Sequence, residues 1–389
     1  MKKKSKIIRI TTVPISLNKL LEGQLRFMKG YYEVLAVSAG PIGELEAVGR
    51  REGVATREVA MTRSITPLKD IKAVWQLYRL FKKEKPSIVH THTPKAGIVG
   101  MLAAWLAGVP NRLHTVAGLP LMEATGFKRT VLNFVEKTTY RFATKVYPNS
   151  KGLYDFIIAE NFTKPSKLSI IGKGSSNGID TDYFNPNLYS ERDKISVRAE
   201  LKIPQHHFLF IFVGRLVKDK GINELIAAFS KLSQSKDNIS LLLVGPFEND
   251  LDPLWPETLI SINENPNIYS VGYQNDVRPY FAVADALVFP SYREGFPNVV
   301  MQAGAMGLPS IVTDINGCNE IIEHSKNGLI IPLKDTNVLQ QAMQKLLTDE
   351  ALYKELRAYA RPMIVSRYAQ QLVWEAIFSE YKKLEGINE

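Results

Sequence analysis

Two positively charged residues, Arg215 and Lys220, stand five positions apart between glycines in a segment that begins at Gly214. The segment directly follows an apolar run over residues 208–213 that is typical of a buried strand. A guanidinium can bond two phosphate oxygens at once, and a lysine adds a compact charge. The helix expected from about Asn223 adds an N-terminus that favours an anion. A solvated basic turn would explain either cation alone, but the two cations with their glycines predict a diphosphate site.

A second segment of this kind runs from Glu294 to Asn298, with the sequence Glu-Gly-Phe-Pro-Asn, after the apolar run at 286–289. A helical pattern follows, so the segment places a carboxylate and free backbone N–H groups at a helix N-terminus. Such groups can bind the hydroxyls of a sugar and the oxygens of a phosphate on one small surface. The alternative is that Glu294 caps the helix, but Gly-Phe-Pro beside a cap is an unusual choice for stability alone.

Parallel strands would bring both segments to one edge of a sheet. Short runs rich in Ile and Val alternate with helical patterns along the whole chain, as in strands that helices cover on both faces. The runs that we interpret as strands are 7–11, 33–37, 87–90, 112–115, 145–147 and 168–171 in the first half, and 208–213, 240–244, 268–271, 286–289, 310–313 and 329–331 in the second. These are too many for one ordinary doubly wound sheet, so the sequence predicts an α/β fold with two Rossmann-like domains.

The domain boundary is expected in a polar, charged stretch from Asn185 to about Pro204, which lacks an apolar periodicity long enough to bury. We therefore predict a first domain over residues 1–185, a second over 186–369, and a hinge near 185–200.

The clearest helical pattern begins near Pro67 and ends before Pro86. Its apolar residues recur at spacings of three and four, which indicates one buried side. The pattern predicts a helix that buries Ile71, Val74, Trp75, Tyr78 and Phe81 and exposes Lys72, Arg79, Lys82 and Lys83.

The composition excludes several classes of protein. A hydrophobic content of 45% over 389 residues argues against a disordered chain, a coiled coil and a small disulfide-stapled protein. The single cysteine, Cys318, forms no internal disulfide. The longest apolar stretch, 98–110, is too short to span a bilayer, and Arg9 soon interrupts the apolar residues that follow the basic start. We therefore expect no signal peptide and a cytoplasmic protein.

The net charge of +10 is unevenly distributed. Residues 1–185 hold 29 Lys and Arg against 14 Asp and Glu, a charge of +15, whereas residues 186–389 hold 20 against 25, a charge of −5. The first half is therefore expected to face something anionic, and nucleic acid, an anionic membrane surface or a phosphorylated substrate would all fit. Drift in surface composition is the plain alternative.

Further short motifs accompany the two segments around Arg215 and Glu294, namely Gly307-Leu-Pro, Thr313-Asp and the residues 176–180. In this order and spacing they resemble the retaining glycosyltransferases of family 4, and the resemblance covers essentially the whole chain. It implies the GT-B fold, in which two Rossmann-like doubly wound parallel-sheet domains face each other across a cleft. The second domain would bind the nucleotide sugar and the first the acceptor, with a C-terminal helix over about 370–389 packing back onto the first.

The resemblance assigns roles in the second domain. Glu294 would contact the donor sugar as a catalytic residue, and Arg215 and Lys220 would hold the nucleotide diphosphate. The family usually has a second glutamate, which bonds the ribose, where this chain has Gln302. Because a Gln oxygen accepts a hydroxyl proton without adding charge, we expect somewhat weaker nucleotide binding. The complete set of expected donor-binding residues is Gly214, Arg215, Lys220, Gly295, Phe296, Pro297, Asn298 and Gln302.

The first domain would supply the acceptor side. His114 resembles the family's histidine near the transferred sugar and is the second expected catalytic residue. We expect His92, Lys95 and Gly118 to contact the acceptor, with Lys95 binding an anion and Gly118 permitting close approach. The histidines of this half lack a third ligand at a familiar metal-site spacing, and the family generally works without a metal, so no metal and no other cofactor is expected.

The resemblance implies transfer of a sugar from a nucleoside diphosphate donor, with a UDP-sugar expected, to a hydroxyl group with retention of the anomeric configuration. Residues 90–97 and 316–320 are similar to those of bacterial capsule and O-antigen enzymes, in whose pathways the acceptor glycan sits on a polyprenyl diphosphate. Such an enzyme would bind peripherally to the anionic inner face of the cell membrane. The basic residues expected to meet this membrane are Lys2, Lys3, Lys4, Lys6, Lys72, Lys82, Lys83, Lys85, Lys128, Arg129, Lys137 and Arg141.

Two other functions remain open from the sequence. A sugar-nucleotide epimerase can share the two-domain fold, although the basic first half and the Glu294 segment argue against it, and it would convert a nucleotide sugar without any acceptor. A nucleic-acid-binding protein would also be basic. However, the first half lacks clustered aromatic residues on strands and a helix-turn-helix pattern, and its charges are dispersed, so no nucleic-acid partner is expected.

Overall fold

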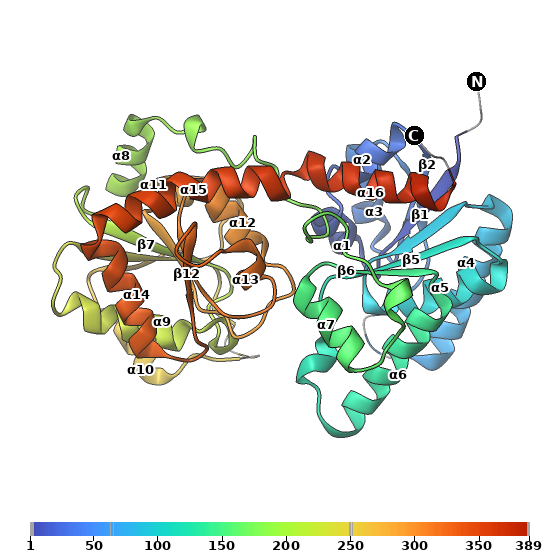
Figure 1. The fold of residues 1–389 in the computed structure, drawn as a ribbon, viewed down its shortest axis with the longest axis horizontal. Coiled ribbons are helices and arrows are strands. Elements are labelled where there is room, and N and C mark those ends of the chain that lie inside the picture. The colour runs from blue at the N-terminus through green and yellow to red at the C-terminus, as the bar shows by residue number, and fades with distance from the viewer. Residues whose placement is uncertain (1–3, 63, 65, 249, 251, 387–389) are drawn as a thin grey trace. The chain divides into compact units, whose positions relative to one another are not determined.

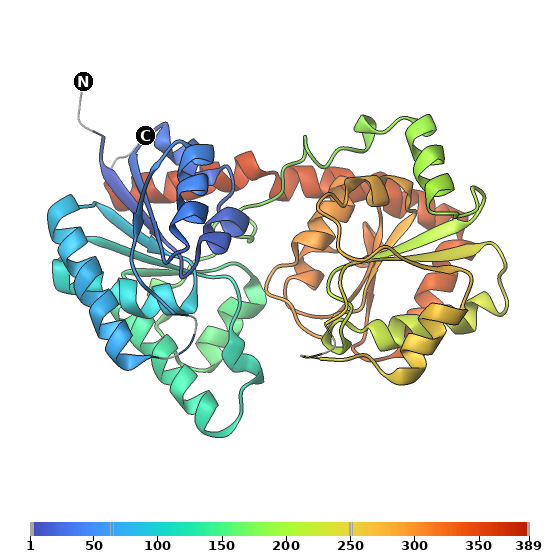
Figure 2. The ribbon, with the colours of Figure 1, turned by 180° about the vertical axis from the view of Figure 1, so that it is seen from behind.

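The computed structural model describes residues 4–62, 64, 66–248, 250 and 252–386. The chain forms two compact units, one from Met1–Gly178 with Gln370–Glu389 and the other from Ile179–Ala369. Each unit is built on a six-stranded parallel sheet with helices on both faces (Figure 1), and Figure 2 shows the same elements from behind. The predicted α/β fold with two doubly wound sheets is confirmed.

The first sheet has the strand order β3-β2-β1-β4-β5-β6. All of its strands are parallel. The chain adds strands on one side of β1 and then crosses over to add β4, β5 and β6 on the other, so the order reverses between β1 and β4. The strands are β1 (Lys6–Ile10), β2 (Glu33–Ser38), β3 (Ala55–Glu58), β4 (Ile88–Thr91), β5 (Asn111–Val116) and β6 (Lys145–Pro148).

Two strands of this sheet differ from the prediction. Strand β3 was missed because it is a short edge strand with the polar sequence Ala-Thr-Arg-Glu and mostly exposed side chains, so it carries no apolar run. The strand predicted at 168–171 is wrong, since Leu168 forms only an isolated bridge with Val146 beyond β6.

Different helices cover the two faces of the first sheet. One core lies under α4 (Pro67–Glu84), α5 (Pro94–Ala107), α6 (Gly126–Phe142) and α7 (Lys151–Ala159). The other lies under α1 (Pro14–Leu20), α2 (Gln24–Lys29), α3 (Ile42–Glu52) and the C-terminal helix α16 (Gln370–Leu384). In α16 Tyr381 is fully buried, and the Phe378 ring stacks on Tyr31 at 4.0 Å. No helix in the described part of the chain is long and apolar enough to cross a membrane.

Helix α4 buries the predicted side only in part. Phe81 is buried, and Val74 and Tyr78 pack, partly buried, against the core as predicted. Ile71 and Trp75 are instead 66% and 56% exposed, and the other buried residues are Ala73 and Leu77. Apolar residues occur on more than one side of this helix, and the spacing of three and four fits either side. Packing against α5 selects the side with the small Ala73. An apolar stripe of α4 is therefore left facing away from the sheet.

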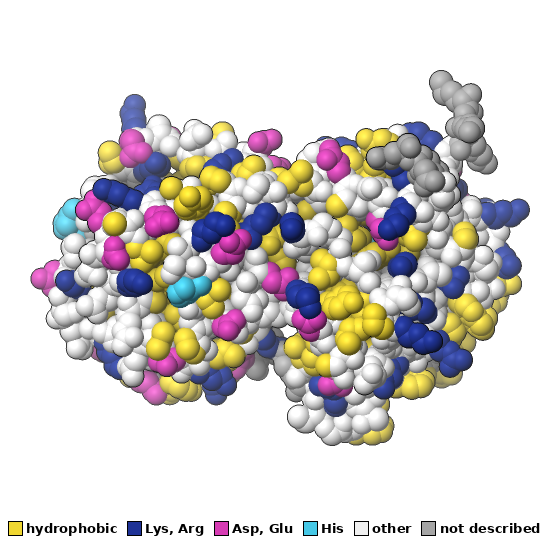
Figure 3. Space-filling view, viewed as in Figure 1, with side chains coloured by type: hydrophobic (Ala, Val, Ile, Leu, Met, Phe, Trp, Pro, Cys, Tyr) yellow, Lys and Arg dark blue, Asp and Glu magenta, His cyan; other side chains and the backbone are white. Residues whose placement is uncertain are grey.

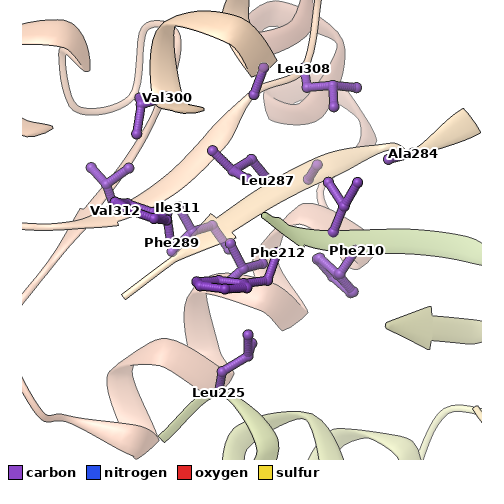
Figure 4. Packing of buried hydrophobic residues seen from close by; sticks show 14 of the residues in the cluster. Phe210, Phe212, Leu225, Ala284, Leu287, Phe289, Val300, Leu308, Ile311 and Val312 are labelled. Carbon is purple, nitrogen blue, oxygen red and sulfur yellow. The ribbon is translucent and has the colours of Figure 1, made fainter. Parts of the chain in front are cut away.

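The second sheet repeats the same topology, with the order β12-β11-β10-β7-β8-β9. Its strands are β7 (Phe208–Val213), β8 (Ile239–Val244), β9 (Ile268–Ser270), β10 (Ala286–Phe289), β11 (Ser310–Thr313) and β12 (Gly328–Ile331), all of them predicted. Its helices are α8 (Glu191–Glu200), α9 (Ile222–Ser233), α10 (Pro256–Glu264), α11 (Arg278–Val283), α12 (Asn298–Ala305), α13 (Cys318–Ile321), α14 (Thr336–Thr348) and α15 (Glu350–Tyr368). The core consists of strand residues such as Phe212 and Phe289, whose rings stack at 5.8 Å, packed against helix residues such as Leu225 and Val300 (Figure 4).

The second unit begins at Ile179, earlier than the predicted boundary at 185/186. The Ile179 N–H donates to the Tyr368 carbonyl oxygen at 2.8 Å, and Phe184 is buried in the second core. The segment before 186 is therefore fixed to α15.

The polar stretch that was expected to be a hinge forms helix α8 instead. Ser190 and Asp193 cap its N-terminus reciprocally. Arg198 is buried at its end, with Nη2 3.0 Å from Asp285. Arg198 also donates to the carbonyl oxygens of Val283 and His207, and Val197 packs against the core, so the helix belongs to the unit without the long apolar periodicity that we looked for.

Candidate active site

The two segments that carry the predicted chemistry lie side by side at the carboxyl edge of the second sheet. Strands β7 and β10 are neighbours, and the strand order reverses between them, which is where doubly wound sheets bind ligands. After β10, Tyr292 donates its backbone N–H to the Asp219 carbonyl oxygen at 2.9 Å. A Cβ at Gly221 would lie 2.1 Å from the Pro290 carbonyl oxygen, so only glycine allows this approach.

Lys220 and Glu294 form the centre of this site. Lys220 Nζ lies 2.5 Å from Glu294 Oε1, and the Ser291 hydroxyl donates to the same oxygen at 3.0 Å. The two charged side chains are 14% and 17% exposed, so each still reaches the surface and can exchange its partner for a ligand. Burial, together with the Glu294 carboxylate, raises the pKa of the Cys318 thiol well above its usual value. The cysteine therefore stays neutral and adds no charge here.

Arg215 adds a second cation at the same edge. It follows Gly214 at the end of β7, and its Nη1 lies 2.7 Å from Glu248 Oε2. The hydrogen bond to Glu248 raises the pKa of the Arg215 guanidinium, which stays charged. Its side chain is 44% exposed, so some of its five N–H donors remain available to a ligand. A Cβ at Gly245 would lie 1.8 Å from the Gly214 carbonyl oxygen, so the turns after β7 and β8 meet backbone to backbone.

The residues that hold the Glu294 loop in shape were missed by sequence reasoning. Asn316, after β11, donates from Nδ2 to the carbonyl oxygens of Glu294 and Gly295, at 3.1 and 2.6 Å. A Cβ at Gly317 would lie 2.5 Å from the Gly295 carbonyl oxygen. Residues 316–320 carried part of the family resemblance, but the sequence did not show what they contact. Because β10 and β11 are neighbouring strands, the segment after β11 lies beside the Glu294 loop after β10.

The loop leads into the N-terminus of α12. Phe296 is buried, and its ring packs 5.3 Å from that of Tyr368, which anchors the loop to the core. Pro297 is the N-cap, no side chain of the described residues caps the first turn, and Asn298 is exposed. The N–H groups of Asn298 and Val299 are therefore available to an anion beside the Glu294 loop, whereas that of Val300 donates to the Pro297 carbonyl oxygen.

Gln302 lies one turn further along α12 and is half-buried. Its side chain forms no hydrogen bond with any residue that the structure describes. The position expected to bond the ribose thus carries an amide that the described residues leave without a hydrogen bond.

Two predicted acceptor residues lie at the corresponding point of the first sheet, where the order reverses between β1 and β4. Thr12, after β1, and Thr93, after β4, bond hydroxyl to hydroxyl at 2.7 Å across this point. His92 lies directly between β4 and Thr93. Lys95, in the first turn of α5, is 9% exposed, and its Nζ lies 2.6 Å from Asp70 of α4. The predicted anion contact is engaged in an ion pair within the unit.

A buried polar network lies behind this point. Arg9 of β1 is fully buried, and its Nε donates to His92 Nε2 at 3.0 Å. His90 bonds the hydroxyls of Tyr381 and Thr115 at 2.6 and 2.7 Å. Burial lowers the pKa of both histidines well below its usual value, so both rings are neutral. His92 Nδ1 has no partner among the described residues, and the ring borders a small polar cavity.

The structure places His114 inside the first unit and Gly118 in the loop after β5. His114 is 2% exposed, its Nδ1 bonds the Thr91 hydroxyl at 2.8 Å, and its ring lies against Gly97 of α5. Burial lowers its pKa to about 4. The side chain packs in the interior beside α5 and α6. A Cβ at Gly118 would meet nothing within 4 Å, so close packing does not require glycine there.

Comparisons with known proteins agree with this geometry. The model of the "Glycosyl transferase 4-like domain" matches residues 29–174, and that of "Glycosyl transferases group 1" matches residues 193–363. The capsular polysaccharide biosynthesis glycosyltransferase CapM of Staphylococcus aureus is 31% identical over 388 residues, which are 99% of this chain and 100% of the relative. The UDP-Gal:alpha-D-GlcNAc-diphosphoundecaprenol alpha-1,3-galactosyltransferase of Escherichia coli is 34% identical over 74% of this chain and 73% of the relative.

Solved structures share the architecture. Anabaena Alr3699/HepE in complex with UDP and glucose matches with a TM-score of 0.80 at 17% identity, over 97% of this chain and 100% of that chain. WaaG, a glycosyltransferase involved in lipopolysaccharide biosynthesis, matches with a TM-score of 0.70 at 16% identity, over 95% of this chain and 98% of that chain. Family models thus cover both units, and the relative from S. aureus aligns over its whole length. The chain belongs to the glycosyltransferases of family 4 and has the GT-B fold.

Proposed function

We propose that this glycosyltransferase transfers a sugar from a UDP-sugar to a hydroxyl group of a polyprenyl diphosphate-linked glycan, with retention, during assembly of a cell-surface polysaccharide. The observation that carries the proposal is the Lys220–Glu294 pair, 2.5 Å apart beside Arg215 where the second sheet reverses its order. It combines two cations for a diphosphate with a carboxylate for a sugar. The relatives support the substrate classes, since one builds capsule and another pairs UDP-Gal with a diphosphoundecaprenol-linked acceptor.

Donor binding would proceed by an exchange of ion-pair partners. Without a ligand, Lys220 neutralises Glu294 and Arg215 neutralises Glu248. The diphosphate takes both cations, assisted by the N–H groups of the first turn of α12. Glu294 is then free to accept hydrogen bonds from the hydroxyls of the donor sugar, while Ser291 continues to orient it. One event thus binds the diphosphate and prepares the carboxylate for the sugar.

Transfer breaks the bond between the anomeric carbon and the diphosphate oxygen and forms a bond to the acceptor oxygen, whose proton passes to the departing diphosphate. Positive charge develops on the sugar ring and negative charge on the departing diphosphate. Arg215 and Lys220 stabilise the diphosphate, and Glu294 orients the ring through its hydroxyls. Since two side-chain cations supply the charge that the leaving group needs, we expect no metal ion or other cofactor to be required.

Acceptor binding belongs to the first unit in this proposal. His92 offers a neutral ring nitrogen to a hydroxyl group, and Lys95 can exchange Asp70 for a phosphate of the acceptor. Gly118 remains a backbone contact at most, and His114 is left out because it lies in the core.

The surface of the first unit suits an anionic membrane. Lys and Arg side chains gather around α4 and α5 in Figure 3, with few Asp and Glu among them. Each cation near an anionic leaflet contributes about 1 kcal/mol to binding. Of the residues expected at this membrane, Lys2 and Lys3 lie outside the described part of the chain. We place the enzyme peripherally at the inner face of the cell membrane.

A screen of UDP- and GDP-sugars with a synthetic prenyl diphosphate-linked sugar as acceptor tests the proposal. We expect turnover only when a UDP-sugar and the acceptor are both present, and we expect it to persist in EDTA. The anomeric configuration of the product, determined by NMR, should equal that of the donor. Conversion of a nucleotide sugar without acceptor would indicate an epimerase, and an inverted product would overturn retention.

A further inference from the structure

An apolar groove lies between α4, α5 and α6 of the first unit and encloses about 430 Å³. This volume is within the range of small-molecule sites. All three helices contribute aliphatic side chains to its lining, among them Ile71, Val74, Ile98, Leu102, Leu132 and Val135.

The apolar surface continues beyond the groove. Leu68, Ile71 and Trp75 share one side of α4 and are 84%, 66% and 56% exposed, and Phe134 of α6 is 70% exposed. Water contact with each Å² of such surface is unfavourable by roughly 25 cal/mol, and soluble proteins rarely leave large apolar patches without a partner. Ile71 and Trp75 belong to the residues that the sequence pattern predicted to be buried, so the helix carries apolar side chains on a second side that its own unit does not bury.

One end of the groove is charged. Lys95 and Asp70 line it and pair at 2.6 Å. Lys95 follows β4 in the first turn of α5, at the carboxyl edge where we place the acceptor. Ile98 and Leu102 follow one and two turns further along the helix, so the lining extends about 10 Å from Lys95 along α5. The groove therefore joins the acceptor position to an apolar surface.

The outward side of α4 is positively charged. Its acidic residues Asp70 and Glu84 are paired, with Lys95 and with Lys6 respectively. Its exposed cations form no ion pair with a residue that the structure describes, and these are Lys69, Lys72, Arg79, Lys82 and Lys83. The groove is thus bordered by cations that no acid of the helix neutralises.

We propose that this groove binds the isoprenoid chain of the lipid-linked acceptor while its diphosphate lies at Lys95. The inference rests on the proposed function, which supplies such an acceptor. A groove whose lining is apolar along most of its length and charged at one end suits a molecule with a hydrocarbon chain and an anionic head group. A protein partner fits less well, because lysine is depleted from the cores of protein interfaces, whereas lipid phosphates attract every cation at the border.

Binding of geranylgeranyl diphosphate tests the groove directly. The titration is done with saturating UDP, so that the cations of the second unit are occupied, and inorganic diphosphate is titrated in parallel. Ile71→Gln removes apolar lining without changing charge, and its high exposure makes loss of folding no concern. Ile42→Gln is the matched control, because Ile42 is 57% exposed on α3, which covers the other face of the sheet.

We expect geranylgeranyl diphosphate to bind the wild type more tightly than inorganic diphosphate does, and Ile71→Gln to weaken it about tenfold. Ile42→Gln should have no effect, and neither variant should change the affinity for inorganic diphosphate. Equal binding of the two probes, unchanged binding in Ile71→Gln, or equal weakening in the control would overturn the proposal.

Turnover separates this inference from the proposed function. Two acceptors with the same sugar diphosphate, one with an isoprenoid chain and one with a short alkyl group, are compared in each variant. Ile71→Gln should lose the preference for the isoprenoid acceptor and keep the rate with the short one. If the wild type uses neither acceptor, the proposed function fails. If both are used and Ile71→Gln keeps the full preference, only the groove assignment fails.

Discussion

The two sheets reverse their strand order at corresponding points, yet the side chains placed there differ in kind. In the second unit this point holds ion pairs that solvent can reach, with Lys220 Nζ 2.5 Å from Glu294 and Arg215 44% exposed. In the first unit it holds a hydroxyl pair, Thr12 and Thr93 at 2.7 Å, in front of buried, neutral histidines.

The same topology can therefore serve two kinds of ligand. An accessible ion pair can exchange a carboxylate for a phosphate without creating an unpaired buried charge, so the second unit suits a diphosphate. In the first unit, the hydroxyl pair and the neutral ring of His92, which the buried Arg9 holds, can align a hydroxyl group, so this unit suits the nucleophile of an acceptor. This difference is the physical basis for assigning the donor to one unit and the acceptor to the other.

The largest effect is expected from removing the central cation of the second unit. Lys220→Ala deletes a charge that holds the diphosphate and leaves Glu294 without its partner. Loss of a charged hydrogen bond costs about 1.5–3 kcal/mol, which predicts a fall in kcat/KM of roughly ten- to hundredfold. Lys326→Ala, which removes a cation from an exposed pair with Glu323 in the same unit, is the control. Equal losses in the two variants would remove the basis for the donor assignment.

A second test asks whether burial keeps a carboxyl group of the first unit neutral. Glu136 of α6 is 5% exposed, and burial raises the pKa of its carboxyl to about 7. Between the ordinary pKa of 4.5 and this value the folded chain holds a proton that the unfolded chain has released. The contribution of Glu136 to the free energy of unfolding therefore falls as the pH rises from 5 to 8.

Glu136→Gln should abolish this fall. The free energy of unfolding of the variant minus that of the wild type, measured by urea denaturation, should rise by roughly 2 kcal/mol from pH 5 to pH 8. Glu44→Gln, at an exposed position in the first turn of α3, is the control. A constant difference between Glu136→Gln and the wild type across this range would show that the carboxyl is ionised in the folded protein.

A smaller effect is expected at the cationic surface of the first unit. Lys72→Ala should weaken binding to vesicles that contain anionic lipid about fivefold at low salt, since one cation near a leaflet contributes about 1 kcal/mol. Added salt should reduce both the binding and the difference. Lys19→Ala, an exposed position on α1 behind the other face of the sheet, should bind like the wild type. Binding that is insensitive to salt and lipid charge would exclude this mode of attachment.

The smallest effect concerns Gln302. Gln302→Glu adds a carboxylate where the ribose is expected, and we predict roughly threefold tighter binding of UDP, the scale of a hydrogen bond that gains charge. Turnover should change little. Binding of 2′,3′-dideoxy-UDP serves as the control, because it lacks the hydroxyls that the carboxylate would accept and should not gain. Weaker UDP binding would show that the amide has another contact.

The meeting of the charged residues of the second unit at one sheet edge could be predicted, because each of them follows a strand closely in the sequence. Arg215, Lys220 and Glu294 each follow an apolar run within a few residues, and neighbouring parallel strands bring such residues to one edge. Their partners could not be predicted, because the bonds from Ser291 and Asn316 depend on how the loops fold back on themselves.

The first unit was harder to predict because neighbouring residues of a strand point to opposite faces. His92 lies beyond the end of β4 and stays near the edge of the sheet. His114 lies within β5 and points into the core. A shift of one residue along a strand turns a side chain to the opposite face, so the sequence alone could not distinguish the two positions. Likewise, the apolar residues of α4 cover two sides of the helix, and packing against α5 determined that Leu77 rather than Ile71 is buried.

Titration calorimetry with UDP and UMP tests the central claim most directly, namely that the cations of the second unit bind a nucleoside diphosphate. The account predicts that the wild type binds UDP at least about tenfold more tightly than UMP. The double variant Arg215→Ala/Lys220→Ala should lose this preference and keep its affinity for UMP. Equal binding of UDP and UMP to the wild type, or a double variant that still prefers UDP, would contradict the account.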